Sequence, residues 1–241
     1  MVDTRKILDG FLNPANPPEG NKDGAATRRS PLDDMNLGGV SGGAAAGGLV
    51  ALLLGTKAGR KMGKSALKLG GFALIAALAY RAWQNWTSKA GQTGATAPVD
   101  APKSLQAPKD TAFLPSRVDE QQRITRNILR AMIAAAKADG HIDAGEMDRI
   151  HAKMDDLDLG VSEKAFVMDE LRAAPDLAAI ARDSRTGEEA AELYAASVLA
   201  IDGTKPEERR HLDRLAGLLG LDDALVSEIE DSVRDVVVLK R

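Results

Sequence analysis

Helix start and stop signals punctuate the second half of the chain and constrain its fold more than any other feature. Capping residues precede segments in which apolar residues recur with helical period; they are Ser116, Asp143, Ser162, Asp176, Thr186, Thr204 and Asp222. The pattern predicts seven helices with short loops, over about 117–138, 144–156, 163–173, 176–182, 187–200, 205–219 and 222–237. Seven closely spaced helices indicate an all-α bundle over residues 115–241.

The amino-acid composition agrees with an all-α fold. Of the 241 residues, 44% are apolar, which suffices for a core, but only 3% are aromatic, fewer than a β-sandwich or barrel requires. The chain has no Cys, which excludes disulfides, thiolate zinc sites, iron–sulfur clusters and Cys nucleophiles. A chain of this length forms one or two folded units.

Charge divides the chain into two unlike parts. Residues 1–114 hold 14 basic and 8 acidic side chains, whereas residues 115–241 hold 18 and 27. The balance is therefore +6 in the first part and −9 in the second, which together give the net charge of −3. A basic first half and an acidic second half indicate two parts with different surroundings.

A stretch of nineteen residues without charge, 38–56, is the strongest signal in the basic half. As an α-helix it would be about 28 Å long, close to the hydrocarbon thickness of a bilayer. Gly39, Gly43 and Gly47 recur every fourth residue, a stripe that lets helices approach closely in a membrane and favours a homo-oligomer. The preceding residues 1–37 are rich in Pro and Gly, and we expect disorder there after a short amphipathic stretch at residues 1–10.

A basic segment and a second apolar run follow within residues 38–87, the region expected to contact the membrane. Four lysines share one helical face, and we expect them to bind anionic lipid rather than nucleic acid: Lys57, Lys61, Lys64 and Lys68. The apolar run 69–80 is too short to span a bilayer, and we expect it to lie at the membrane surface. Tyr80, Trp83 and Trp86 at its end are typical of a membrane–water interface. Residues 88–114, rich in Ser, Thr, Ala and Pro, predict a flexible linker.

Two similar loops bring carboxylates to helix junctions of the bundle. Asp139–Gly140 precedes Asp143 and Glu146, and Asp202–Gly203 precedes Glu208. Five carboxylates would supply most of the oxygens that Ca²⁺ or Mg²⁺ requires, so one hypothesis is a divalent-metal site of Asp139, Asp143, Glu146, Asp202 and Glu208. The alternative is structural, because Asp143 and Glu146 also fit an N-cap and its partner, and Asp-Gly is itself a turn signal.

No catalytic motif accompanies these carboxylates. The three His residues lack the HExxH spacing, and neither a phosphate-binding GxxxxGK[ST] loop nor a GxSxG nucleophile motif occurs. The sequence therefore favours a non-enzymatic protein, with a metal-dependent hydrolase that uses the carboxylates as an alternative.

The order of these segments resembles one bacterial family. LLLGTKAGRKMGKSALKLGGFALIAALAYRAWQNW over residues 49–87, together with residues 118–238, resembles the YebE-type inner-membrane proteins. KADGHIDAGEMDRI and LAIDGTKPEERRHLDRLAGLLGL resemble the TerB-like domain linked to tellurite resistance. The resemblance implies a TerB-like all-α domain and a divalent-metal role for Asp139, Glu146, Asp202 and Glu208, although the second loop is one residue shorter than usual.

These observations lead to one functional hypothesis with two alternatives. We expect a protein of the bacterial inner membrane whose acidic helical domain lies in the cytoplasm, as the positive-inside rule indicates for a single span at 38–56. That domain would sense or bind a divalent cation, Ca²⁺ or Mg²⁺, or a protein partner, in response to envelope or metal stress. The alternatives are a soluble scaffold that oligomerises through the Gly-rich segment and the hydrolase.

Overall fold

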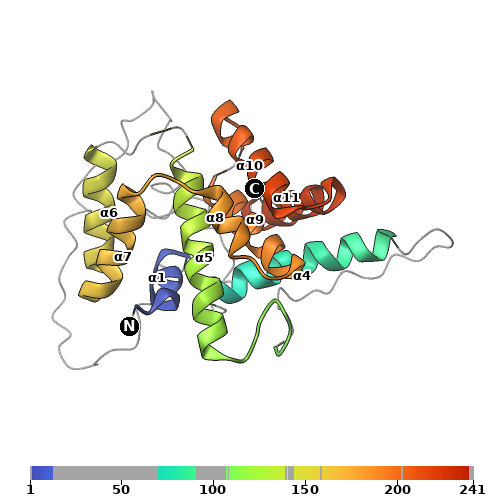
Figure 1. Cartoon of the computed structure of the whole chain (residues 1–241), viewed down its shortest axis with the longest axis horizontal. Coiled ribbons are helices and arrows are strands. Elements are labelled where there is room, and N and C mark those ends of the chain that lie inside the picture. The colour runs from blue at the N-terminus through green and yellow to red at the C-terminus, as the bar shows by residue number, and fades with distance from the viewer. Residues whose placement is uncertain are drawn as a thin grey trace.

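The computed structural model describes residues 2–12, 70–90, 107, 109–138, 140, 144–157, 159–201 and 203–238. Regular structure within these ranges is α-helical, so the predicted all-α fold is confirmed (Figure 1). The seven helices expected after residue 115 are all present. They are α5 (Val118–Ala136), α6 (Ala144–Asp156), α7 (Val161–Arg172), α8 (Leu177–Arg182), α9 (Gly187–Ala200), α10 (Pro206–Leu219) and α11 (Asp223–Val238).

Several of the predicted caps form the expected hydrogen bonds. Thr186 Oγ1 accepts from the backbone N–H of Glu189 at 3.2 Å, and Asp176 Oδ1 accepts from that of Ala179 at 2.9 Å. Each bond satisfies a backbone donor that the first turn of a helix leaves free. Gly220 ends α10 in the left-handed conformation (φ +65°), which Gly adopts without a Cβ penalty.

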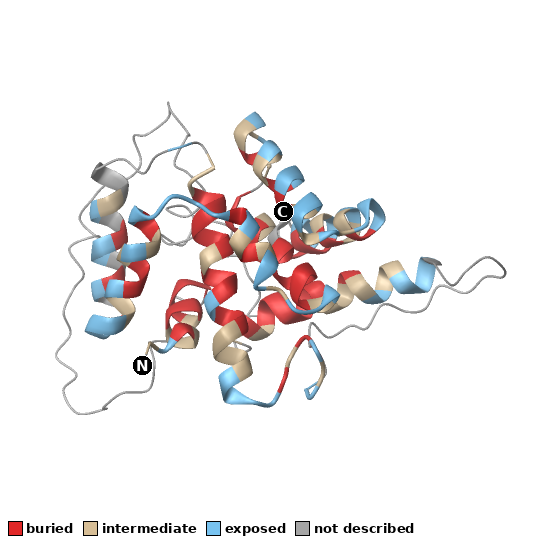
Figure 2. Ribbon diagram, in the orientation of Figure 1, coloured by how far each residue is buried: buried red, intermediate tan, exposed pale blue. Residues whose placement is uncertain are grey.

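Helix α9 lies at the centre of the bundle. It packs against α5, α4, α11 and α10, and every residue from Glu189 to Ser197 is buried. Buried residues gather where these helices meet (Figure 2). Its Ala-rich sequence suits this position, because small side chains let neighbouring helices approach closely. The opposing apolar face of α5 includes Ile128 and Leu129, both at most 1% exposed.

Two further helices, from the part of the chain expected to lie outside the bundle, complete its core. Helix α1 (Thr4–Leu12) packs on α5, and α4 (Gly71–Ala90) packs on α9, α11 and α1 (Figure 1). Within the segment 1–37 assigned to disorder, residues 4–12 form a helix, because Ile7 and Leu8 are fully buried in the shared core. The amphipathic pattern at residues 1–10 marks this buried face.

The part of the apolar run 69–80 that the structure describes, from residue 70 onward, lies in the core, which corrects the expectation that this run lies at the membrane surface. Leu74, Ile75 and Leu78 of α4 are at most 2% exposed, and their surroundings are other helices of the bundle. Burial of this face explains why the run is apolar but too short to span a bilayer. Among the helices of the described residues, none is both long and apolar enough to cross a membrane.

The segment that ends the expected linker 88–114 also contacts the bundle. Phe113 is 4% exposed, and its ring packs edge-on against Tyr80 at 5.6 Å and Trp83 at 5.9 Å between centroids. Trp83 contacts Trp86 in the same way at 5.2 Å. Edge-to-face pairs of this kind are favourable beyond the apolar area that they bury. The three aromatic residues assigned from the sequence to a membrane interface therefore form an aromatic cluster within the folded chain.

Candidate functional site

Most of the acidic residues proposed as metal ligands lie outside the described part of the chain. Asp139, Asp143 and Asp202 are not described, and neither is the side chain of Glu146. Among the side chains that are described, no group of three or more His, Asp or Glu residues is placed to hold a metal ion. The divalent-metal site therefore stays a prediction.

In the two acidic loops, the glycines that the structure describes have the backbone conformation of tight turns. Gly140 and Gly203 both have positive φ, +105° and +68°, as expected for the second residue of an Asp-Gly turn. Glu208, one of the five proposed ligands, is 6% exposed and lies 3.6 Å from Lys205 Nζ in an i,i+3 ion pair. The positive charge beside Glu208 in this structure is therefore the ammonium group of Lys205.

The lysines proposed to contact lipid, Lys57, Lys61, Lys64 and Lys68, also lie outside the described residues, as do the glycines of 38–56. The proposed lipid contacts and the glycine-mediated oligomer therefore stay predictions.

The described structure has a cleft lined by several arginines, which we call the arginine cleft. It has a volume of about 460 Å³, within the range of small-molecule sites. Helix α5 contributes Arg123, Arg126, Asn127 and Arg130 to its lining, and the remaining residues are Glu170, Arg182, Asp183 and Arg185 from α7, α8 and the α8–α9 loop. The lining thus holds five guanidinium groups and two carboxylates.

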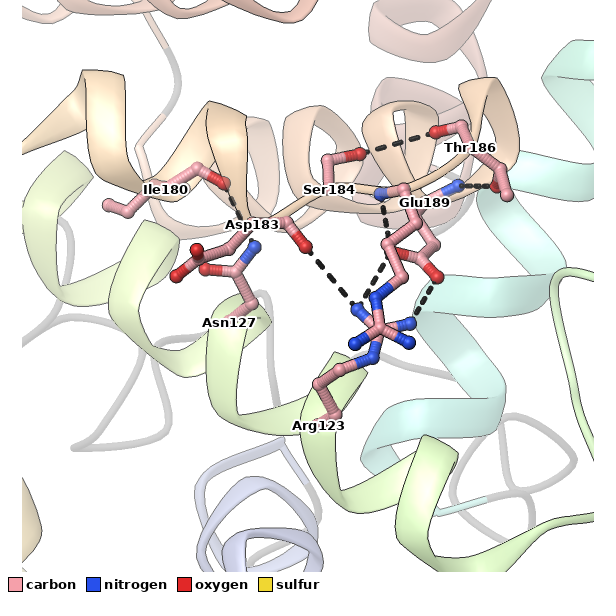
Figure 3. Close-up of polar contacts among 8 residues, drawn as sticks. Arg123, Asn127, Ile180, Asp183, Ser184, Thr186 and Glu189 are labelled. Carbon is pink, nitrogen blue, oxygen red and sulfur yellow. Dashed lines mark hydrogen bonds and ion pairs between the residues drawn. The ribbon is translucent and has the colours of Figure 1, made fainter.

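The side of the arginine cleft near α9 is fixed by an ion pair between Arg123 and Glu189. The guanidinium of Arg123 donates to both carboxylate oxygens, one of them Oε2 at 3.0 Å, and also to the carbonyl of Asp183 at 3.3 Å (Figure 3). Glu189 is 5% exposed and also accepts from the backbone N–H of Arg185 at 2.9 Å. The hydrogen bond with Glu189 raises the pKa of Arg123, and the contact holds the loop after α8 against α5.

Arg130 and Asn127 fix the other side of the cleft. Arg130 donates to Asp183 at 2.8 Å and lies 3.5 Å from Glu170, so it pairs with both acids of the lining. Asn127 is 6% exposed, and its Nδ2 donates to the carbonyl of Ile180 at 3.0 Å (Figure 3). Its Oδ1 is buried and has no hydrogen-bond partner among the described residues. A buried acceptor of this kind has a free-energy cost unless a donor reaches it.

Three arginines of the cleft remain without an acidic partner among the described residues. The side chains of Arg182 and Arg185 form no ion pair or hydrogen bond there. Arg126 lies over the ring of Phe166, 5.2 Å from its centroid, in a cation–π contact. When Glu189 is counted with the two acids of the lining, the five guanidinium groups carry a surplus of two positive charges. Guanidinium groups that are close together and not neutralised attract anions, and their planar donor pairs match phosphate and carboxylate oxygens.

A smaller hollow of about 200 Å³ continues from the arginine cleft. It shares Arg123 and Arg185 with the main cleft and adds Arg117, Asp119 and Glu120. Arg117 is paired with Asp119 at 2.8 Å, and Glu120 adds a negative charge that acts on Arg123, so the two hollows together carry a surplus of one positive charge.

The arginine cleft was not predicted from the sequence, although the sequence contains part of its signal. Arg123, Arg126 and Arg130 are spaced i, i+3 and i+7, which places them on one face of the helix predicted at 117–138. Arg182 and Arg185 join them only through the packing of α8 against α5. The spacing of arginines along α5 could be seen in the sequence, but the packing of α8 against α5 could not.

The described structure is thus an all-helical bundle with an arginine-rich cleft. Residues 39–233 match the family described as a protein of unknown function, DUF533, and the chain therefore belongs to this TerB-like family.

One curated relative is similar to part of the chain. It is an uncharacterised protein from the ampR 5′ region of Yersinia enterocolitica, 31% identical over 114 residues, a match that covers 47% of this chain and 81% of the relative. No solved structure matches the chain.

Proposed function

We propose that this protein is a membrane-associated, non-catalytic binding protein whose helical bundle holds a small anionic ligand in the arginine cleft. The observation that carries the proposal is the surplus of two positive charges around a hollow of about 460 Å³. Non-catalytic binding is supported by the pairing of both carboxylates of the lining, those of Glu170 and Asp183, with Arg130.

The rigidity of the cleft also supports a binding role. Arg123 and Arg130 are held by acids and carbonyls, so the cleft keeps its shape without a ligand. Arg182 and Arg185 keep donors available for an anion. A site whose walls are fixed in advance loses less entropy on binding.

Calorimetric titration of the full-length protein with inorganic phosphate tests the anion site. Arg182→Gln combined with Arg185→Gln should weaken phosphate binding at least about tenfold, because two charge-assisted donors are lost. The matched control is Arg210→Gln combined with Arg234→Gln, which removes the same charge from exposed surface pairs on α10 and α11. Equal weakening by both pairs of substitutions, or no binding by the unmodified protein, would contradict the proposal.

Association with the bacterial inner membrane is the second part of the proposal. The uncharged stretch 38–56 and the basic segment that follows it support contact with anionic lipid. The described helices add one constraint: α1 and α4 pack on each other, so residues 12 and 70 lie on the same side of any membrane. A single crossing by 38–56 would separate them, so we propose that this stretch enters and leaves the membrane on one face, the cytoplasmic one.

Cysteine labelling tests this topology directly, because the natural chain contains no Cys. Single substitutions Asp3→Cys and Val161→Cys place thiols at exposed positions on the two sides of the uncharged stretch in the sequence. In membrane vesicles of either orientation, a membrane-impermeant maleimide should label both sites or neither. Labelling of one site alone would contradict the same-side arrangement, and release of the protein by carbonate washing would contradict membrane insertion.

A further inference from the structure

We propose that Glu192 is a pH-sensitive switch of the arginine cleft: the cleft binds anions while this carboxyl group is neutral and loses affinity for them when it ionises. The inference rests on the proposed anion-binding function and adds a regulation of the same site. Three observations carry it: the complete burial of Glu192, its position beside Glu189 on α9, and a buried donor of Arg123 that has no partner among the described residues.

The surroundings of Glu192 favour a neutral carboxyl group. Glu192 has no exposed surface, and neither of its oxygens has a hydrogen-bond partner within the described part of the chain. A buried carboxylate without hydrogen-bond donors is costly, so the group takes up a proton instead of staying charged. Burial accordingly raises the pKa of Glu192 well above 4.5, and the negative charge of Glu189 raises it further. Glu192 therefore changes its charge at a higher pH than an exposed carboxylate does.

The position of Glu192 on α9 connects it to the cleft. Glu192 follows Glu189 by three residues, and side chains with this spacing are neighbours on one face of a helix. Glu189 in turn accepts from the guanidinium of Arg123 at 3.0 Å (Figure 3) and from the backbone N–H of Arg185 at 2.9 Å. A charge that appears at Glu192 thus lies next to the ion pair that fixes this side of the cleft.

Arg123 is the cation through which Glu192 acts on the cleft. Its side chain lines both hollows, and its positive charge favours the ionised form of Glu192. Its Nε is buried and has no acceptor among the described residues, whereas its other two nitrogens donate to Glu189 and to the carbonyl of Asp183. An ionised Glu192 competes with Glu189 for this guanidinium and adds a negative charge behind the cleft. Both effects lower the affinity of the cleft for anions.

The other charges around α9 leave this coupling in place. Helices α4, α10 and α11 also pack on α9, and they hold charged side chains in ion pairs with one another; these pairs are Arg81 with Asp235, Lys89 with Glu228, and Arg209 with Glu230. On α9 itself, Glu188 and Glu189 are both acidic and oppose the ionisation of Glu192. Of the charges that act on Glu192 within the described residues, that of Arg123 is the positive one.

Sulfate titrations of the full-length protein test the switch. Sulfate is the probe because it keeps two negative charges from weakly acidic to alkaline pH, whereas phosphate changes its own charge near neutral pH. The pH at which Glu192 ionises is first measured by carbon NMR of its carboxyl group, and calorimetry then gives the affinity for sulfate below and above that pH. We expect the unmodified protein to lose at least about threefold in affinity, whereas Glu192→Gln should keep the higher affinity throughout because the amide does not ionise.

A control variant and a second readout separate the switch from a general effect of pH. Glu228→Gln removes one carboxylate, paired with Lys89, from α11 outside the cleft, and it should lose affinity as the unmodified protein does. The second readout needs no ligand. The NMR signal of the Arg123 Nε–H group should shift at the pH where Glu192 ionises, and this shift should be absent in Glu192→Gln.

Each result has a definite consequence. The same pH dependence of sulfate affinity in Glu192→Gln and in the unmodified protein overturns the switch while leaving the anion site in place. A Glu192 carboxyl group that stays neutral up to about pH 9, or an Arg123 signal that ignores its ionisation, overturns the switch as well. Absence of sulfate binding by all three proteins at every pH overturns the proposed function itself. The two failures are therefore distinguishable.

Discussion

Asp9 Oδ1 accepts a 2.6 Å hydrogen bond from the backbone N–H of Gly71 and so joins two residues that are 62 positions apart. Gly71 is the first residue of α4, and its N–H is one of the donors that a helix start leaves without an intrahelical partner. A side chain of α1 therefore caps α4 in the way that a neighbouring Ser or Asp usually would. The contact fixes both ends of the intervening segment at one place in the bundle.

Loss of this interhelical cap should lower stability by about 1 kcal/mol, the usual cost of removing an N-cap acceptor. We expect Asp9→Ala to show that loss in chemical denaturation. Asp9→Asn retains an oxygen acceptor and should lose less. Equal effects of the two substitutions would mean that the hydrogen bond to Gly71 is not what stabilises the start of α4.

Close packing at the same junction predicts opposite effects for two Gly-to-Ala substitutions. A Cβ at Gly71 would lie 2.7 Å from the carbonyl oxygen of Leu8, which is backbone and cannot move aside. We expect Gly71→Ala to destabilise the protein by about 1–3 kcal/mol, as overpacking does. A Cβ at Gly217 in α10 would meet nothing within 4 Å, and Gly217→Ala should stabilise by about 0.5–1 kcal/mol through helix propensity. Thermal melting of both variants checks the difference in sign.

The sequence was sufficient to predict the seven C-terminal helices, because their signals are local. Caps such as Thr186 and Asp176 act within one turn of their helix, and helical periodicity marks the buried face. The place of α1 and α4 in the core was not predictable in this way. A short apolar run looks the same whether its surroundings are lipid or protein, and only the tertiary contacts of Ile75 and Leu78 decide between them.

The candidate site was less accessible from sequence than the fold. The acidic residues at the Asp-Gly loops stand out because they are close together in the sequence. The arginines of the cleft do not, because Arg123 of α5 and Arg185 of the α8–α9 loop meet only through Glu189. Arginines on one face of a helix are expected to be exposed. Whether each of them has an acidic partner depends on how the helices pack, which the sequence does not show.

A buried carboxyl on α9 gives a prediction about pH. Glu192 is fully buried, and neither of its carboxylate oxygens has a hydrogen-bond partner among the described residues. Burial raises the pKa of Glu192 well above its usual value of 4.5, and the nearby Glu189 and Glu188 raise it further. A raised native pKa means that this group's contribution to stability is complete below about pH 4.5 and is lost as the pH rises toward the native pKa.

Glu192→Gln should therefore raise the melting temperature at pH 7, by several degrees if about 1–2 kcal/mol is recovered, because the amide does not ionise. The gain over the unmodified protein should shrink as the pH falls toward 4.5. Glu188→Gln, on the same helix but only half-buried, serves as the matched control and should show little of this pH dependence. Parallel melting curves against pH for Glu192→Gln and the unmodified protein would contradict the argument.

His211 on α10 predicts a pH dependence of opposite sign. Burial lowers the pKa of His211 to about 4, with a further contribution from the positive charge of Arg214, and its Nε2 has no partner among the described residues. The neutral ring is favoured in the native state. The contribution of His211 to stability is therefore complete above its unfolded-state pKa near 6.5 and is lost as the pH falls toward 4.

In the variant His211→Gln, stability should fall less between pH 6.5 and pH 4 than in the unmodified protein. In NMR titrations Arg214→Gln should raise the pKa of His211, while the exposed Arg172→Gln should leave it unchanged.

The acidic loops provide the last prediction, which decides between a divalent-metal site and structural caps. If Asp139, Asp143, Glu146, Asp202 and Glu208 form one site, a cation that binds only the folded state adds about 2.7 kcal/mol at a hundredfold excess over its Kd. Millimolar Ca²⁺ or Mg²⁺ should then raise the melting temperature by about 5–10 °C.

The experiment requires the full-length protein, because α1 and α4 supply part of the core around α9 and α5. Asp139→Asn or Asp202→Asn should abolish the increase, whereas Glu207→Gln, beside Glu208 but paired with Arg210, should retain it. A melting temperature that responds to neither ion would remove the metal hypothesis and leave these carboxylates as caps and turn residues, with Asp143→Ala then costing about 1 kcal/mol in the presence or absence of metal.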